Sequence, residues 1–190
     1  MISIPYHIIL ASKSPRRKQL LEGLSLTFEI KTKDTDESFS PDLQKEDIAL
    51  YLAQKKADAF TDLKNNELLI TADTIVWIEN QVLNKPENRN EAIKMLEMLS
   101  GKKHDVYTGV CIKTNDKTIT FYDQTEVYFK ALNINEIEFY VDNYAPYDKA
   151  GSYGAQDWIG FVAIEKMIGS YFNVMGLPVH KVYDVLKSFS

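Results

Sequence analysis

The order of apolar and polar positions predicts alternating strands and helices in the first hundred residues. The short apolar run over 7–11 is typical of a buried strand, and residues 26–32 alternate like a strand. Between them, Ser14 followed by Pro15 is a typical helix start, and this helix should end near residue 24. Three further elements are expected: a helix over 43–63, a nearly continuous apolar strand over 68–78, and a helix from an Asn88 cap to Leu99, closed by Gly101.

The second half of the chain favours paired strands. Segments 103–114 and 117–132 should pair around a turn at 114–117, and the remaining elements should be a helix over 134–144, a strand over 161–169 and a last helix over 178–189. This order predicts a mixed α/β sheet flanked by helices, in two lobes with a cleft. No linker divides the chain, so residues 1–190 are expected to form a single domain, with a lobe boundary that the pattern does not define.

Composition narrows the classes of function. The chain has 45% apolar and 26% charged residues, which is ordinary for a globular protein, and a net charge of −5, which disfavours a generic nucleic-acid surface. Its single cysteine, Cys111, cannot form an internal disulfide or a thiolate zinc site and is expected to be a buried strand residue. No apolar run is long enough to span a membrane, and the start lacks the basic region of a signal peptide. We therefore expect a cytoplasmic protein without a membrane partner.

A cluster of cations stands at the first predicted helix start. Arg16, Arg17 and Lys18 follow the cap directly, where the helix dipole disfavours positive charge by about 0.3–1 kcal/mol each. The arrangement makes sense if backbone N–H groups, these cations and the hydroxyls of Ser12 and Ser14 converge on a phosphate. A solvated basic helix start is the alternative. We favour the phosphate because the segment directly follows a buried strand.

Three acidic residues are candidates for catalysis or metal binding. Asp73 lies inside the apolar run 68–78, where a carboxylate is costly to bury without a partner. It is equally consistent with a structural pair and with a general base or metal ligand, and Thr74 beside it suits either a ligand contact or a strand. Asp36 and Glu37 lie in a polar loop. They are ordinary solvated acids unless a nearby phosphate makes them magnesium ligands.

Two lysines and one loop complete the candidates. Lys56 lies on the apolar side of its helix, either with only its tip in solvent or pointing at phosphate. Lys85 precedes Pro86, so it should be extended, and alone it would be an ordinary surface lysine. Gln156, in the glycine-rich segment 151–160, offers a donor and an acceptor to a base edge, although a tight turn explains the segment as well. No role is assigned to the scattered histidines His7, His104 and His180.

Together these segments resemble the Maf family. The matching stretches run in family order from residue 10 to about residue 180 and are LASKSPRRKQLL, the loop acid Glu37, QKKA, ADTIV, LNKP, MLEMLSGKKHDVYTGV, DKAGSYGAQ and NVMGLPV. The resemblance covers nearly the whole chain. It implies a two-lobed α/β fold akin to that of the inosine triphosphate pyrophosphatases.

The resemblance also implies an activity: hydrolysis of a nucleoside triphosphate to the monophosphate and pyrophosphate, with a divalent cation such as Mg²⁺ or Mn²⁺. Carried over residue by residue, Asp73 matches the proton acceptor and is a candidate metal ligand, and Glu37 matches an acid that acts through the metal. The phosphate-contacting positions correspond to Ser12, Arg16, Arg17, Lys56 and Lys85.

Base preference can be carried over as well. The family branch that resembles dTTP and UTP pyrophosphatases has Arg, Thr and Gln at three selective positions, and Arg16, Thr74 and Gln156 match them. This chain departs from the family at Asp157, where many members have a small residue. Two alternatives stay open: a pyrophosphatase for purine or modified nucleotides in a house-cleaning role, and a nucleotide-sensing protein linked to septum formation. The expected partner is a nucleoside triphosphate, and the sequence allows a homodimer without deciding it.

Overall fold

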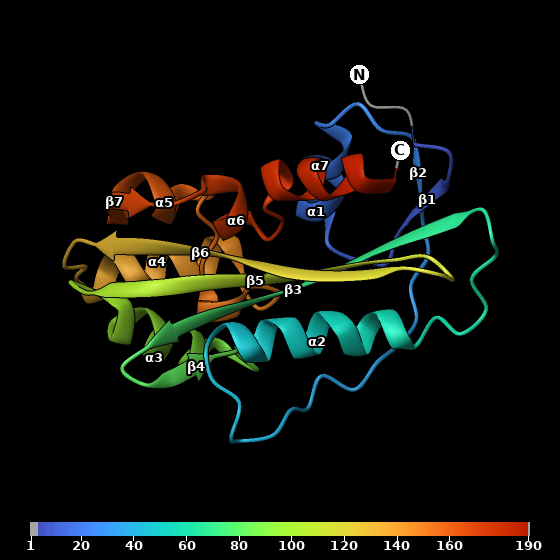
Figure 1. The fold of residues 1–190 in the computed structure, drawn as a ribbon. Coiled ribbons are helices and arrows are strands. Elements are labelled where there is room, and N and C mark those ends of the chain that lie inside the picture. Colours follow the sequence, from blue (N-terminus) through green and yellow to red (C-terminus); the bar gives the residue numbers. More distant parts are fainter. Residues whose placement is uncertain (1–3, 190) are drawn as a thin grey trace. The chain divides into compact units, whose positions relative to one another are not determined.

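The computed structural model describes residues 4–189, so residues 1–3 and 190 of the predicted domain lie outside it (Figure 1). The strands are β1 (His7–Leu10), β2 (Phe28–Ile30), β3 (Glu67–Ile78), β4 (Gln81–Leu83), β5 (Lys103–Lys113), β6 (Thr118–Phe129) and β7 (Ile164–Ile168). The helices are α1 (Pro15–Glu22), α2 (Glu46–Asp58), α3 (Arg89–Leu99), α4 (Ile134–Tyr144), α5 (Trp158–Ala163), α6 (Tyr171–Met175) and α7 (Val179–Leu186), with two short 3-10 helices, η1 (Ala150–Ser152) and η2 (Lys187–Phe189). Within the described range, no helix is both long and apolar enough to cross a membrane.

The strands form one mixed sheet, which confirms the predicted fold class. Their order is β2-β1-β3-β5-β6-β7, with β4 paired to β3. Strand β1 is parallel to both β2 and β3, whereas the pairs β3–β4 and β6–β7 are antiparallel. In the β1–β3 pair, Leu10 is opposite Ile70. Strand β1 ends at Leu10 whereas β3 continues, so Asp73 lies beyond the part of β3 that pairs with β1.

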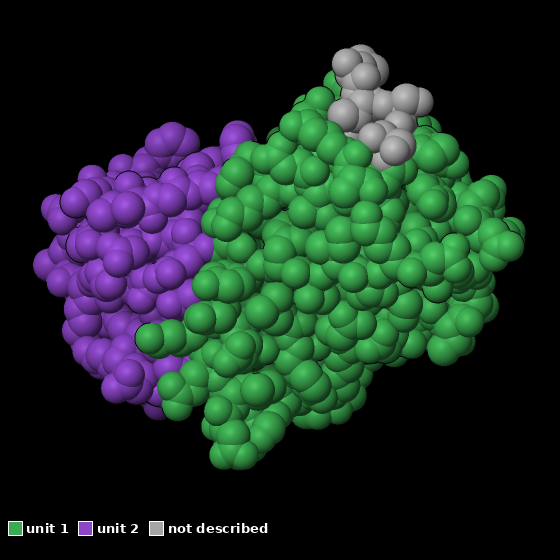
Figure 2. Space-filling view, in the orientation of Figure 1, with its two compact units in different colours: residues 1–73, 108–123, 176–190 green, residues 74–107, 124–175 purple. Residues whose placement is uncertain are grey.

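The chain divides into two compact units, coloured separately in Figure 2. Unit 1 comprises residues 1–73, 108–123 and 176–190, and unit 2 comprises residues 74–107 and 124–175. Strands β3, β5 and β6 each contribute residues to both units. The unit boundary, which the sequence pattern left undefined, thus crosses the chain within three long strands and once more after α6, between residues 175 and 176. The cleft expected from the resemblance stays a prediction.

The core of unit 1 joins helix α2 to the sheet. Ala53 of α2 packs with Ile9, Leu69 and Cys111, and all four are buried. Figure 1 shows α2 along one face of the sheet, with α1 and α7 on the other. Cys111 is a buried strand residue as predicted, and burial raises the pKa of its thiol to about 11. Gly109 of β5 allows the close approach, because a Cβ there would lie 2.3 Å from a carbonyl oxygen of α2.

The core of unit 2 is rich in aromatic rings. It joins β3, β5 and β6 to α3, α4 and α5. His104 is buried at its centre, packs edge-on against Phe129, and shares a 2.7 Å hydrogen bond with the hydroxyl of Tyr153. Burial lowers the pKa of His104 to about 3. The side chain is therefore a neutral core group at physiological pH.

Most predicted helix ends are confirmed by their capping residues. Ser14 and Asn88 cap α1 and α3 through their side chains, and Asn133 forms a capping box at the start of α4. Gly101, just after α3, has a φ of +69°, as a residue that closes a helix requires. The hairpin turn predicted over 114–117 is also present, since the N–H of Thr114 donates to the carbonyl of Lys117.

Several boundaries were wrong. The helix predicted over 43–63 covers only Glu46–Asp58, because Lys45 has a left-handed φ of +50° and the chain turns at Ala59. The strand predicted over 161–169 begins only at Ile164. The residues before it form α5, in which Ile159 and Ala163 are buried at helical spacing. The pattern did not predict β4 and α6, which have three and five residues and are too short to show a period.

Candidate active site

The turn between β1 and α1 has the structure that its sequence predicts. The hydroxyl of Ser14 accepts from the backbone N–H of Arg17 at 3.4 Å, and the N–H of Ser14 donates to the hydroxyl of Ser12 at 3.2 Å. Pro15 is the first helical residue. Ser12 is buried, whereas Arg16 is half-buried, and no acidic residue stands in the first turn of α1 to offset the cations. The turn and the helix cap are therefore formed as predicted in unit 1, whereas the convergence of these groups on a phosphate stays a prediction.

Arg17 has a structural contact that the sequence did not indicate. Its Nε donates to the backbone carbonyl of Gly176 at 2.7 Å, which ties α1 to the segment before α7. Burial lowers the pKa of Arg17, and the charge of Arg16 acts in the same direction, while the carboxylates of Asp73 and Glu37 oppose it. Arg17 is thus a packing residue of unit 1 and also part of the electrostatic field around Asp73.

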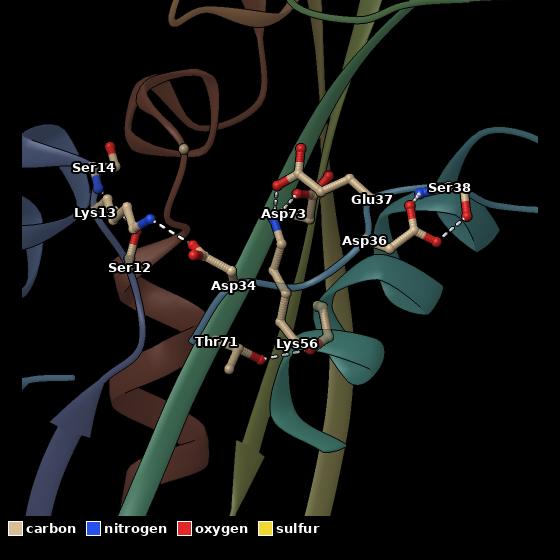
Figure 3. A network of polar contacts seen from close by, with 12 residues as sticks. Ser12, Lys13, Ser14, Asp34, Asp36, Glu37, Ser38, Lys56, Thr71 and Asp73 are labelled. Atoms are coloured by element: carbon tan, nitrogen blue, oxygen red, sulfur yellow. Dashed lines mark hydrogen bonds and ion pairs between the residues drawn. The ribbon is translucent and has the colours of Figure 1, made fainter. Parts of the chain in front are cut away.

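Three of the predicted site residues meet directly. The ammonium of Lys56, on α2, contacts Oδ1 of Asp73 at 2.5 Å and Oε1 of Glu37 at 2.8 Å, and it lies between the two carboxylates in Figure 3. The side chains of Lys56 and Asp73 are only 16% and 11% exposed, compared with 47% for Glu37. The buried carboxylate in the apolar strand therefore has a charged partner, which offsets the cost of its burial.

Helix α2 holds this group in place through three further contacts. Thr71, two residues before Asp73 on β3, donates its hydroxyl to the carbonyl of Ala53 at 2.7 Å, one turn before Lys56. Lys55 contacts the loop that carries Glu37: its ammonium donates to Oδ2 of Asp36 at 3.1 Å and to the Ser38 carbonyl at 2.8 Å. Lys55 thus binds the loop, and the next residue of the helix, Lys56, binds the carboxylates of Glu37 and Asp73.

The loop itself is tightly turned around Glu37. Both the backbone N–H and the hydroxyl of Ser38 donate to the carboxylate of Asp36. These bonds, with the ammonium of Lys55, lower the pKa of Asp36 to about 2, and the hydroxyl of Ser38 has the largest effect. Because Asp36 and Ser38 flank Glu37, their contacts fix the backbone from which its carboxylate extends.

The carboxylates of Glu37 and Asp73 are suited to a divalent cation. Magnesium is commonly held by one or two carboxylates, with the remaining ligands supplied by water and substrate phosphate. Here two carboxylates already share one cation, the ammonium of Lys56. Across residues 4–189 no group of three or more His, Cys, Asp or Glu side chains could hold a metal by itself. The donor set therefore fits an ion that arrives with phosphate.

The other three predicted residues belong to unit 2. Thr74 is half-buried and follows Asp73 on β3. Lys85 is exposed in the irregular segment after β4, as predicted, next to Asn84, whose carbonyl accepts from the N–H of Gly151 at 3.1 Å. Gln156 lies in the turn before α5, and its Nε2 donates to Oδ1 of Asp157 at 3.2 Å. Each is placed in a defined local structure, and their roles stay predictions.

The sequence analysis did not assign roles to two residues that contact the site residues. The sequence pattern did not indicate a role for Lys55, because its partner Asp36 is 19 positions away in an irregular loop. Asp157 was noted only as a departure from the family. Its contact with Gln156 and its bond to the hydroxyl of Tyr140 show that it is part of a local network.

Comparisons with known proteins show to which family the chain belongs. The family described as Maf-like protein matches residues 7–189. A dTTP/UTP pyrophosphatase of Bacteroides fragilis (strain YCH46) is 54% identical over 96% of this chain and 95% of its own length. Proteins with the same name from Flavobacterium johnsoniae and Porphyromonas gingivalis (strain W83) are 50% and 49% identical, over 95% and 97% of this chain and 94% of each relative.

Among solved structures, the Ham1 protein of Staphylococcus aureus aligns with a TM-score of 0.46 at 14% identity, covering 65% of this chain and 71% of that one. A HAM1 protein from Coxiella burnetii gives a TM-score of 0.41 at 18% identity, covering 65% of this chain and 73% of that one. The family assignment depends on the sequence matches, which extend over nearly the whole chain. The chain belongs to the Maf-like protein family.

Proposed function

We propose that this protein is a nucleoside triphosphate pyrophosphatase that hydrolyses dTTP and UTP to the nucleoside monophosphate and pyrophosphate. The observation that carries the proposal is the group of Asp73, Lys56 and Glu37, just beyond the point where the parallel pairing of β1 and β3 ends. Relatives about half identical over nearly the whole chain bear the name dTTP/UTP pyrophosphatase, which supports the same assignment.

The phosphates are assigned to the basic groups of unit 1. Arg16, Arg17 and the N-terminus of α1 supply positive charge and N–H donors, and the hydroxyl of Ser12 adds a further donor. Lys56 exchanges one of its carboxylate partners for a phosphate oxygen when substrate binds. These cations stabilise the charge that develops on the phosphates in the transition state. Lys85 of unit 2 is included as a further phosphate contact on the family resemblance.

Asp73 is the proposed proton acceptor. It takes a proton from the attacking water as the oxygen bonds to the α-phosphorus. The bond between that phosphorus and the bridging oxygen breaks, and its electron pair leaves with pyrophosphate. Asp73 is mostly buried, and it is carried by a long strand paired on both sides. Such a rigid position suits a base that must remain within hydrogen-bond reach of the water.

A divalent cation, Mg²⁺ or Mn²⁺, completes the proposal. Asp73 and Glu37 would hold it, since their carboxylates already converge on one positive charge. When bound, such an ion neutralises phosphate charge and lowers the pKa of bound water. Base preference is assigned to Arg16, Thr74 and Gln156, the three positions that match the dTTP and UTP branch.

The proposal includes a cytoplasmic location, without nucleic acid or a membrane as partner. The net charge of −5 supports the exclusion of nucleic acid. A homodimer is compatible with this function, and sedimentation of the purified protein measures it directly. Fractionation of cells that produce the full chain tests the location.

The test is a panel of nucleoside triphosphates, each with Mg²⁺, with Mn²⁺ and with a chelator, scored for released pyrophosphate. We expect dTTP and UTP to be the best substrates and the chelator to abolish turnover. Equal or better turnover of GTP or ITP would favour the purine or modified-nucleotide alternative. Tight nucleotide binding without any turnover would favour a nucleotide-sensing protein.

A further inference from the structure

The side-chain amide of Gln156 has two different surroundings. On one side its Nε2 donates to Oδ1 of Asp157 at 3.2 Å. On the other side its oxygen, Oε1, is buried and has no hydrogen-bond partner within the described residues. A buried acceptor without a donor is costly, so its persistence in a folded protein calls for an explanation.

Asp157 is held by groups that leave it only one orientation. Its Oδ2 accepts from the hydroxyl of Tyr140 at 2.8 Å, and that hydroxyl accepts from the N–H of Gly154 at 3.1 Å. Tyr140 is fully buried in α4, and the ammonium of Lys149 lies 3.7 Å from the carboxylate. Asp157 precedes α5 at the capping position, yet its side chain makes no cap bond. Its carboxylate is committed to Tyr140 and Gln156.

Gly154 allows this network to form. A Cβ at this position would lie 2.6 Å from Oδ2 of Asp157 and 2.7 Å from Nε2 of Gln156. Hydrogen bonds therefore run in one direction, from the backbone of Gly154 through Tyr140 to Asp157, with Gln156 donating from the other side. Because a carboxylate only accepts, the amide cannot reverse without placing oxygen against oxygen.

We propose that Asp157, supported by Tyr140, is a positioning residue for base selection: it orients the Gln156 amide so that only its oxygen is presented to a base. This inference depends on the proposed function. The ring N3 of uracil and thymine carries a hydrogen and donates, whereas N3 of cytosine accepts. An amide oxygen that faces N3 therefore accepts from uracil and thymine and is repelled by the N3 lone pair of cytosine. The oxygen is buried, so the base contacts it only after the side chains that cover it move aside.

The test compares kcat/KM for dTTP and dCTP in the wild type, Asp157→Asn and Tyr140→Phe. An asparagine both donates and accepts, so the Gln156 amide can reverse and present its NH₂ group. We expect Asp157→Asn to lower the dTTP to dCTP ratio by about tenfold, as when a hydrogen-bonded group loses its matched partner. Tyr140→Phe should lower the ratio less. In a Gln156→Ala background, Asp157→Asn should change the ratio no further.

Asp142→Asn is the matched control. Asp142 lies on the same helix as Tyr140 but pairs with Arg89, and the substrate ratio should not change. An unchanged ratio in folded Asp157→Asn and Tyr140→Phe proteins overturns the inference. If the wild type hydrolyses no nucleotide, the proposed function fails. Thermal shifts with dTMP and dCMP then decide the inference separately: a dTMP preference that Asp157→Asn removes supports it, and equal shifts overturn it.

Discussion

The polar side chains of the candidate site have different kinds of partner in unit 1 and in unit 2. In unit 1 the partners are charged. The ammonium of Lys56 lies between two carboxylates, and the charges of these two carboxylates also act on Arg17. In unit 2, a single carboxylate orients neutral groups, and one amide oxygen is left without a donor within the described residues. Charge neutralisation suits phosphate chemistry, whereas a fixed donor and acceptor pattern suits recognition of a base.

The proposed function predicts that the two arrangements respond differently to substrate. In unit 1 the phosphate would compete with contacts that already exist, so binding would exchange one ion pair for another. In unit 2 a donor fills a position that is already oriented, so binding adds a bond without breaking one. Substitutions in unit 1 should therefore change rate and stability together, whereas substitutions around Gln156 should change the choice of base.

The largest expected effect is that of Asp73→Asn on turnover. The change keeps the size of the side chain and removes its charge and basicity, so dTTP hydrolysis should fall by at least about 10²-fold. The protein should still fold, because the asparagine oxygen can accept from Lys56. Asp58→Asn is the control, since Asp58 lies on the same helix as Lys56 but pairs with Lys113 of β5. Near-normal turnover in a folded Asp73→Asn protein would assign Asp73 a purely structural role.

Arg17→Ala should reduce both stability and ligand response. The bond to Gly176 involves a charged donor, so its loss should lower the free energy of unfolding by about 1.5–3 kcal/mol. The rise in melting temperature produced by pyrophosphate with Mg²⁺ should also shrink, because a phosphate contact is lost. Thermal denaturation with and without ligand measures both. A lower melting temperature with an unchanged ligand shift would make Arg17 a packing residue only.

Buried His104 of unit 2 should make the free energy of unfolding depend on pH. The pKa of His104 is about 3 when folded, against an ordinary value of 6.5. As the pH falls through 6.5, the unfolded chain binds a proton that the folded chain does not. Stability is therefore full above pH 6.5 and decreases toward pH 3, by about 1.4 kcal/mol per pH unit.

Urea unfolding at pH 7 and pH 5 measures this dependence. His104→Gln should show a smaller loss of stability between the two values than the wild type. His7→Gln, at an exposed position, should behave like the wild type. Parallel losses in the wild type and in His104→Gln would show that the proton uptake belongs to other groups.

These cases show which contacts the sequence can predict. Helix starts at Ser14 and Asn88 were predictable, because a cap acts on the next three residues. The direct contact of Lys56 with Asp73 was not predicted, and only the family resemblance assigned both to one site, since 17 positions and a strand order separate them. The bond from Arg17 to Gly176 spans 159 positions and ends on a backbone carbonyl, which has no side-chain signal. Long-range contacts to the backbone thus escape pattern analysis.

The smallest expected effect concerns Lys55 and sharpens the picture of unit 1. Lys55 contacts neither Glu37 nor Asp73 in the bonds described above, but it holds the turn of Asp36 and Ser38 that flanks Glu37. Its partners are exposed, so Lys55→Met should cost at most about 1 kcal/mol of stability. A less fixed Glu37 should weaken the proposed metal site, and the Mg²⁺ concentration for half-maximal turnover should rise by a few-fold.

A double-mutant cycle separates this positioning effect from a general one. If Lys55 acts through Glu37, then Lys55→Met should raise the Mg²⁺ requirement of the wild type but leave that of Glu37→Gln unchanged. Lys55→Arg should keep the Mg²⁺ requirement close to that of the wild type, since a guanidinium can also reach a carboxylate and a carbonyl. Lys113→Met, which removes another exposed pair of α2, should leave the requirement unchanged. Additive effects of Lys55→Met and Glu37→Gln would show that Lys55 acts on the charge around the site and not on the position of Glu37.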